Sequence, residues 1–102
     1  MLKDLKEVYS NFNSFENEEI TLQGWVRNHR KQKEIGFIDF NDGTSFKGAQ
    51  LVYDNSLADF DDIQKLHIGS AITVTGKLVK SLREEQLFEI VVKSIKLEGD
   101  CP

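Results

Sequence analysis

The clearest strand pattern in the chain lies in residues 20–55, which read ITLQGWVRNHRKQKEIGFIDFNDGTSFKGAQLVYDN. Apolar and polar side chains alternate from Glu19 to Arg30, and this alternation predicts a first strand with one face in the core and one in solvent. The predicted inward positions are Ile20, Leu22, Gly24 and Val26.

A second strand is predicted in the segment GFIDF, after a hairpin connection formed by the polar run 28–34. Along this strand Ile38 and Phe40 fall on one face, and Phe37 and Asp39 fall on the other. Because Ile38 and Phe40 continue the apolar pattern of the first strand, we expect Phe37 to point away from the core.

A turn is predicted at 41–43, where the sequence is Asn-Asp-Gly. Asn and Asp bond nearby backbone groups, and Gly accepts a positive φ without steric cost. A third strand is then predicted over 47–53, with Ala49 and Leu51 pointing inward and Gln50 pointing outward.

The rest of the chain predicts two more strands and short helices. Between 54 and 70 the apolar residues recur at intervals of three, as on one face of a helix, at Leu57, Phe60, Ile63 and Leu66. Alternation returns at 71–80 and, after the charged loop 81–86, at 87–97. Near the N-terminus, Leu2, Leu5 and Val8 indicate one stripe of a helix.

Five strands with one helix between the third and the fourth is the element order of an OB-fold, a small Greek-key barrel. We therefore predict an all-β protein in which residues 19–98 form the five-stranded OB-fold barrel and residues 1–18 form an N-terminal helical extension. An SH3-like barrel is the structural alternative. The helix between strands three and four favours the OB-fold, whose face of strands two and three binds oligonucleotides or oligosaccharides.

Composition limits the class of protein. The chain has 102 residues, of which 39% are hydrophobic and 29% charged, and its formal net charge is −4. This is typical of one folded domain with a small core. No apolar stretch is long enough to cross a membrane, so we expect a cytoplasmic protein without membrane contact. With Cys101 as the single cysteine, an internal disulfide and a cysteine zinc site are excluded.

The motifs of common enzyme sites are absent. His29 and His67 have no partner at metal-ligand spacing, and we expect both to be solvated. The glycines form neither GxxxxGK nor GxGxxG, so nucleotide hydrolysis is not predicted. Four aspartates surround the predicted helix start, where carboxylates favour the free N–H groups and the helix dipole: Asp54, Asp59, Asp61 and Asp62.

Five basic or titratable side chains gather in seven residues that contain no carboxylate. They are Arg27, His29, Arg30, Lys31 and Lys33. In an acidic chain such a cluster indicates a local anion site, although an ordinary solvated hairpin would show the same run.

The predicted outward face supplies further groups for binding a base. An outward Phe37 beside basic residues offers a ring on which a base can stack, unless it covers a barrel end or packs under the N-terminal helix. Gln50 offers a donor and an acceptor for the edge of an unpaired base. Glu89 on the last strand adds an acceptor for an amino or imino group. Together with Arg30, these side chains predict single-strand RNA recognition.

Residues 19–99 resemble the N-terminal anticodon-binding OB domain of the class IIb aminoacyl-tRNA synthetases. The similarity is carried by Gly24-Trp25-Val26 with Arg30, by Phe37-Ile38-Asp39, by Gln50 and by Val74-Thr75-Gly76. Within the family, the segment NDGTSFKGAQLVYDN looks most like the asparaginyl member.

The resemblance implies residue roles and a larger protein. Phe37 would stack on the central anticodon base, Gln50 would read it, and Arg30 would contact the anticodon loop. Glu89 aligns ambiguously with a region that helps to read the third base. The family joins this domain to a catalytic domain that binds ATP and Mg and forms a homodimer. We therefore expect residues 99–102 to begin a linker, no cofactor in this domain, and a fragment that is monomeric and binds the tRNA anticodon stem-loop.

The sequence is also compatible with three alternative functions: an aspartyl-type anticodon domain, a general single-strand binder, and a protein-interaction module. A general binder would need broader basic coverage than a chain of net charge −4 provides. An interaction module would use the acidic segment 54–62 or the N-terminal helix as its contact surface.

Overall fold

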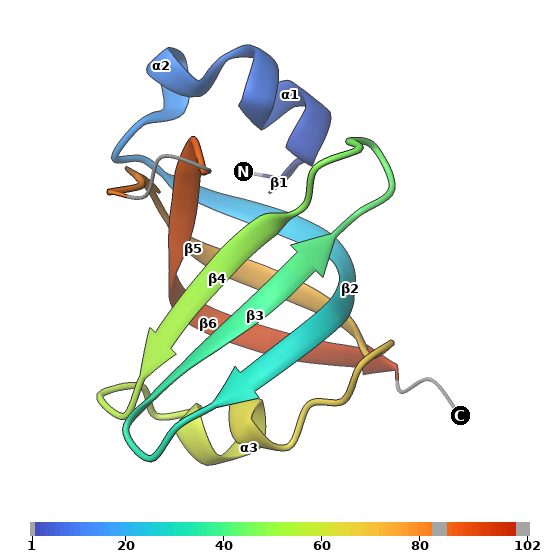
Figure 1. Cartoon of the computed structure of the whole chain (residues 1–102), viewed down its shortest axis with the longest axis vertical. Coiled ribbons are helices and arrows are strands. Elements are labelled where there is room, and N and C mark those ends of the chain that lie inside the picture. The colour runs from blue at the N-terminus through green and yellow to red at the C-terminus, as the bar shows by residue number, and fades with distance from the viewer. Residues whose placement is uncertain (1, 83–85, 100–102) are drawn as a thin grey trace.

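The computed structural model describes residues 2–82 and 86–99, and it consists mostly of strands with three short helices (Figure 1). The strands are β1 (Leu2–Lys3), β2 (Glu19–Lys31), β3 (Ile35–Asn41), β4 (Ala49–Asp54), β5 (Ala71–Lys80) and β6 (Phe88–Gly99). The helices are α1 (Leu5–Ser10), α2 (Phe12–Phe15) and α3 (Phe60–Gln64). Helices α1 and α2 lie at one end of the barrel and α3 at the other.

The sheet closes on itself. Its strand order is β1-β2-β3-β4-β6-β5, and an additional β2–β5 pairing joins the two sides. Strands β4 and β6 run parallel, and the other barrel pairs are antiparallel. This is a five-stranded OB-fold barrel with α3 between its third and fourth strands, which confirms the predicted fold class. The two-residue β1, parallel to β2, was not predicted.

The core is formed by the inward faces that the alternation predicted. Leu22, Val26, Ile38, Phe40 and Leu51 are fully buried inside the barrel. Contacts among these apolar side chains hold together strands that are far apart in the sequence. Burial of each such side chain stabilises the fold by roughly 1.5–3 kcal/mol. The predicted face assignments of the first three strands are therefore confirmed as far as Val26.

The N-terminal extension belongs to the same core. Leu5, Val8 and Phe12 are buried, and the ring of Phe12 stacks on Phe88 of β6 with centroids 5.8 Å apart. The expected apolar stripe was wrong for Leu2, which is 58% exposed and lies in β1. The stripe was also incomplete, because Phe12 of α2 was not predicted to be buried.

Strand β2 departs from strict alternation at a bulge between Val26 and Asn28. The predicted hairpin connection over 28–34 is confirmed only at residues 32–34, since β2 continues to Lys31 and pairs with β3 as far as Gly36. The bulge reverses the side on which later residues point. Val26 faces the core, whereas Arg30, four residues later in β2, faces outward. Without the bulge, both side chains would lie on the same face.

Some expectations fall partly outside the described residues. The structure does not describe residues 83–85 of the charged loop or residues 100–102, which include Cys101 and all of the expected linker except Gly99. Gly99 itself ends β6, so this strand begins one residue later and ends two residues later than predicted. No helix among the described residues has the length and apolar character needed to cross a membrane.

Candidate nucleic-acid interface

The outer face of β2, β3, β4 and β6 carries two rows of side chains that lie side by side in register. The first row contains Asn28, Asp39, Gln50 and Glu89, and it is polar throughout. The second row contains Arg30, Phe37, Val52 and Val91, and it is apolar except for its edge. Residues 61 positions apart in the sequence, such as Asn28 and Glu89, thus lie in one row because β4 pairs with β6.

A chain of hydrogen bonds begins at Arg30 of the second row and continues along the first row. The Arg30 guanidinium donates to Gln50 Oε1 at 2.8 Å, and Gln50 Nε2 donates to Glu89 Oε2 at 3.1 Å. Gln86 Nε2 also donates to Gln50 Oε1 at 3.4 Å. Gln50 is only 6% exposed, so the predicted outward direction is right, but neighbouring side chains cover the amide. These partners hold Gln50 in one orientation.

The ring of Phe37 lies next to this chain and is half-buried. Arg30 Cζ lies 5.2 Å from the ring centroid, which is a cation–π distance. The ring therefore neither fills the core nor packs under the N-terminal helix. A flat ring with a guanidinium beside it and hydrogen-bonding amide and carboxylate groups one row away can stack a base and contact its edge.

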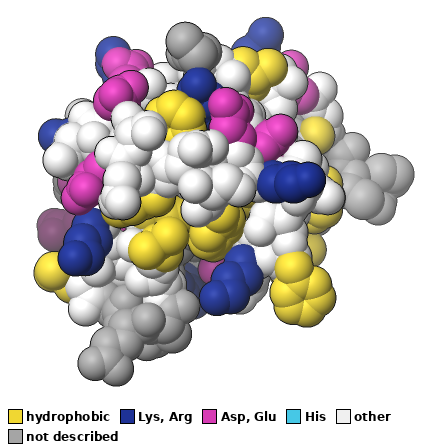
Figure 2. All heavy atoms as spheres, turned by 90° about the horizontal axis from the view of Figure 1, so that it is seen from above, with side chains coloured by type: hydrophobic (Ala, Val, Ile, Leu, Met, Phe, Trp, Pro, Cys, Tyr) yellow, Lys and Arg dark blue, Asp and Glu magenta, His cyan; other side chains and the backbone are white. Residues whose placement is uncertain are grey.

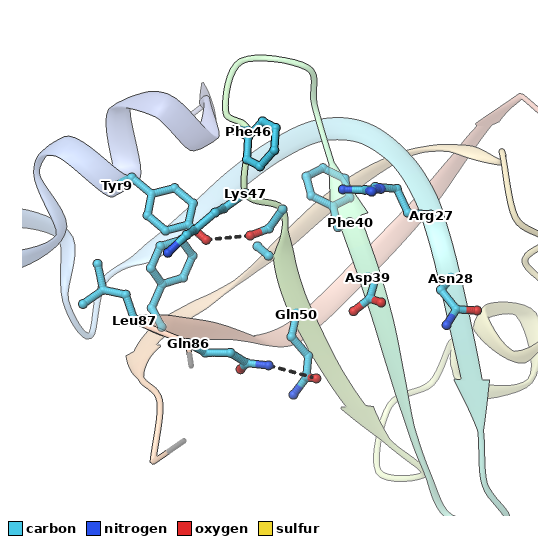
Figure 3. A pocket seen from close by; sticks show the side chains of 13 residues that line it. Tyr9, Arg27, Asn28, Asp39, Phe40, Phe46, Lys47, Gln50, Gln86 and Leu87 are labelled. Atoms are coloured by element: carbon cyan, nitrogen blue, oxygen red, sulfur yellow. Dashed lines mark hydrogen bonds between the residues drawn. The ribbon is translucent and has the colours of Figure 1, made fainter. Parts of the chain in front are cut away.

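A pocket of about 660 Å³ opens beside the polar row, toward the end of the barrel where α1 lies (Figure 3). Its polar and charged walls come from Arg27, Asn28, Asp39, Lys47, Gln50 and Gln86, and its apolar walls include Tyr9, Phe46 and Leu87. Sequence reasoning included Arg27 and Gln50 but missed the others as site residues. The sequence feature that could have indicated Phe46 and Lys47 is an aromatic residue next to a basic residue in a polar loop.

The basic run does not act as one cluster. Arg27 lines the pocket, and Arg30 lies on the outer face beside Gln50. Lys31 pairs with Gly36, in the row of the buried Tyr53, and Lys33 lies in the turn after β2. His29 pairs with the buried Ile38, on the inward side of β2. The structure therefore brings two of the five predicted residues to the face that holds Phe37 and Gln50.

The amino-acid sequence matches a known protein family over most of its length. The family described as OB-fold nucleic acid binding domain, of the tRNA anticodon type, matches residues 20–98. The chain belongs to this family. It is 40% identical to an asparagine–tRNA ligase of Desulfitobacterium hafniense over 95% of this chain and 21% of the relative. It is 43% identical to an asparagine–tRNA ligase of Clostridium beijerinckii over 93% of this chain and 20% of that relative.

A solved structure agrees with the fold of this OB-fold domain. Asparaginyl-tRNA synthetase of Entamoeba histolytica superposes with a TM-score of 0.73 at 23% identity, over 85% of this chain and 22% of the other. The chain thus spans about a fifth of the length of the relatives that it matches.

The inward position of His29 makes it a structural residue of this OB-fold domain. Tyr53 Oη lies 2.6 Å from Nε2, and the Leu66 carbonyl lies 3.1 Å from Nδ1. The expectation that His29 is solvated was therefore wrong. A carbonyl only accepts, so Nδ1–H donates to it and the Tyr53 hydroxyl donates to Nε2, which fits the neutral ring. Burial, helped by the charge of Lys31, lowers the pKa of His29, although the bond to Leu66 opposes this.

The acidic segment near α3 shows no arrangement of its own for chemistry. Asp61 and Asp62 lie in the first turn of α3, where carboxylates are favourable, but the Asp59 side chain at the N-cap makes no capping bond. The hydroxyl and backbone N–H of Ser56 lower the pKa of Asp54. Within residues 2–82 and 86–99, no group of three or more His, Cys, Asp or Glu is placed to hold a metal ion.

Charge on the α1 and α2 side of the domain is mixed. Figure 2 shows acidic and basic side chains interspersed over this end, with hydrophobic side chains exposed between them. Such a surface has no continuous positive field for a polyanion, so an RNA site must rely on a few placed cations.

Proposed function

We propose that this OB-fold domain binds the anticodon loop of the asparagine tRNA and is the RNA-reading part of an asparagine–tRNA ligase. The observation that carries the proposal is the alignment of Arg30, Phe37, Gln50 and Glu89 on one outer face. The asparagine assignment is supported by about 40% identity to asparagine–tRNA ligases over more than nine tenths of this chain.

In this proposal Phe37 stacks under one unpaired base, and the polar row reads the edge of that base. Gln50 offers both a donor and an acceptor, while Glu89 accepts from an amino or imino group. The Arg30–Gln50–Glu89 bonds orient the amide before RNA binds, so less side-chain entropy is lost on binding. Arg30 can exchange its bond to Gln50 for a phosphate or a base without leaving the face.

Aminoacylation, with its ATP and Mg, is proposed to reside in the four fifths of the relatives that this chain does not span. We propose the same location for the main contacts of a homodimer and expect this domain to be monomeric. The domain on its own then binds RNA without catalysing a reaction.

The test is a titration of the domain with three fluorescent stem-loops that carry the asparagine, aspartate and lysine anticodons. We expect the tightest binding to the asparagine loop. Phe37→Ala should weaken that binding by about 5- to 150-fold, because stacking is worth roughly 1–3 kcal/mol per base. The thermal midpoint should change little, since the ring lies on the outer face.

Leu97→Ala is the matched control, because Leu97 is an apolar residue of β6 that is 46% exposed and lines a different pocket. It should leave RNA affinity unchanged. Tightest binding to the aspartate loop would make the domain an aspartyl-type reader. Equal affinity for all three loops and for unrelated single strands would make it a general binder, and no RNA binding at low salt would contradict the proposal.

A further inference from the structure

The segment that joins β3 to β4, residues 42–48, is held in place by the N-terminal extension. Asp42 Oδ2 accepts from Leu5 N–H at 2.8 Å, and Thr44 Oγ1 accepts from Lys6 N–H at 3.0 Å. At the other end, the Tyr9 hydroxyl donates to the Gly48 carbonyl at 2.6 Å. We call residues 42–48 the 42–48 loop. Its position is set by three contacts to one helix.

Phe46 is fully exposed although this loop is anchored on both sides of it. Its side chain is 100% accessible, whereas most large apolar residues of the domain pack into the barrel. Figure 3 shows the ring at the rim of the pocket, above Lys47. One exposed aromatic ring is not unusual in a protein, so its meaning depends on what surrounds it.

The surroundings of Phe46 suit a nucleotide. The pocket under the ring is lined by two cations, Arg27 and Lys47, and its lining continues to Gln50 of the polar row. Flat rings accept bases of any sequence, and nearby cations contact the phosphates of the strand. A protein partner would be better matched by a continuous apolar patch than by this mixture.

We propose that Phe46 is a second stacking residue, which takes an unpaired nucleotide other than the one on Phe37. Lys47 and Arg27 contact the phosphates that flank it. This inference rests on the proposed function, and it extends the bound strand from the outer face of the sheet to the 42–48 loop. Phe37 and Phe46 then contact two different nucleotides of one RNA.

The first measurement compares three variants of the whole 102-residue chain in binding the preferred stem-loop. Phe46→Ala should weaken binding by about 5- to 150-fold, whereas Phe46→Trp should bind like the wild type, because an indole ring also stacks. Ile68→Ala is the matched control, since Ile68 is 65% exposed but lies outside the pocket. The thermal midpoints of all three should match that of the wild type. Unchanged RNA affinity in Phe46→Ala overturns the proposal.

The second measurement locates the contacted nucleotide. Stem-loops with one abasic residue at each loop position are titrated with wild type, Phe37→Ala and Phe46→Ala. If each ring stacks on its own base, the loss from Phe46→Ala vanishes at one abasic position and the loss from Phe37→Ala vanishes at another. The inference is contradicted if the losses from Phe37→Ala and Phe46→Ala both vanish at the same abasic position, or if the loss from Phe46→Ala vanishes at none. Because the effect of Phe37→Ala is scored separately, the proposed function can stand when this inference fails.

Discussion

His29 joins three segments with its two ring nitrogens. It lies on β2, the Tyr53 hydroxyl that it contacts belongs to β4, and the Leu66 carbonyl follows α3. Burial raises the pKa of Tyr53 to about 12, so the hydroxyl keeps its proton and remains a donor to Nε2. Gly36 leaves room for the Tyr53 ring, since a Cβ there would lie 2.1 Å from its hydroxyl oxygen. Arg30, which follows His29, is held on the outer face by the same stretch of β2.

The lowered pKa of His29 predicts that acid weakens the domain. The unfolded chain binds the proton near the ordinary pKa of 6.5, whereas the folded state binds it only at lower pH. Stability is therefore fully present above pH 6.5 and falls as the pH drops toward the folded pKa. Urea unfolding at pH 7.5, 6.5 and 5.5 should show a larger loss in the wild type than in His29→Gln. His67→Gln should follow the wild type, and parallel curves for all three proteins would contradict this role.

The N-terminal extension and the 42–48 loop act together at the scale of elements. Helix α1 supplies backbone N–H groups to the loop, and its Tyr9 ring lies 4.7 Å from that of Phe88. The extension thus positions one wall of the pocket and also covers the end of the barrel. Its sequence alone has little helix-forming strength, because helices of six and four residues are not stable without tertiary contacts.

Truncation of Phe12 tests whether the extension is part of the core. Phe12 is 8% exposed and stacks on Phe88, so Phe12→Ala should cost roughly 3–5 kcal/mol of unfolding free energy. Asn13→Ala on the same helix is the control, because Asn13 is exposed and the change should cost little. The measurement is chemical denaturation at pH 7.5. A loss below about 1 kcal/mol would mean that the extension only rests on the barrel.

The whole molecule is acidic, with a net charge of −4, and few cations lie where RNA is proposed to bind. Arg27 and Lys47 line the pocket and Arg30 borders Phe37. Long-range attraction of RNA is therefore weak, and specificity depends on stacking and base-edge contacts more than on phosphate contacts.

This charge distribution predicts a shallow salt dependence. Three phosphate contacts to a single strand correspond to a slope of about −2 in a plot of log affinity against log salt concentration. Lys47→Gln should reduce the slope by about 0.7. Lys93→Gln should leave it unchanged, because Lys93 pairs with Glu19 on another part of the surface. A slope steeper than about −4 would require phosphate contacts beyond these three.

The sequence by itself was enough to predict the five barrel strands, their order and most of their faces, with the exception of β2 beyond Val26. The reason is local: alternation of apolar and polar side chains decides which face of a strand is buried, and Ile38 next to Phe37 already separates the two faces of β3. The same alternation placed Phe37 and Gln50 on the outer face, and the basic run on the neighbouring strand joined them to Arg30 before the family resemblance assigned the three residues their roles.

Only the tertiary structure decided which other residues share that face. The β2 bulge turns Arg30 outward and His29 inward, and strict alternation from Val26 would have placed them the other way round. The burial of Gln50 and the joining of Tyr9, Phe46 and Arg27 at one pocket depend on contacts between segments far apart in the chain. A bulge and a pocket arise from pairing and packing between strands, so the pattern within one strand does not contain them.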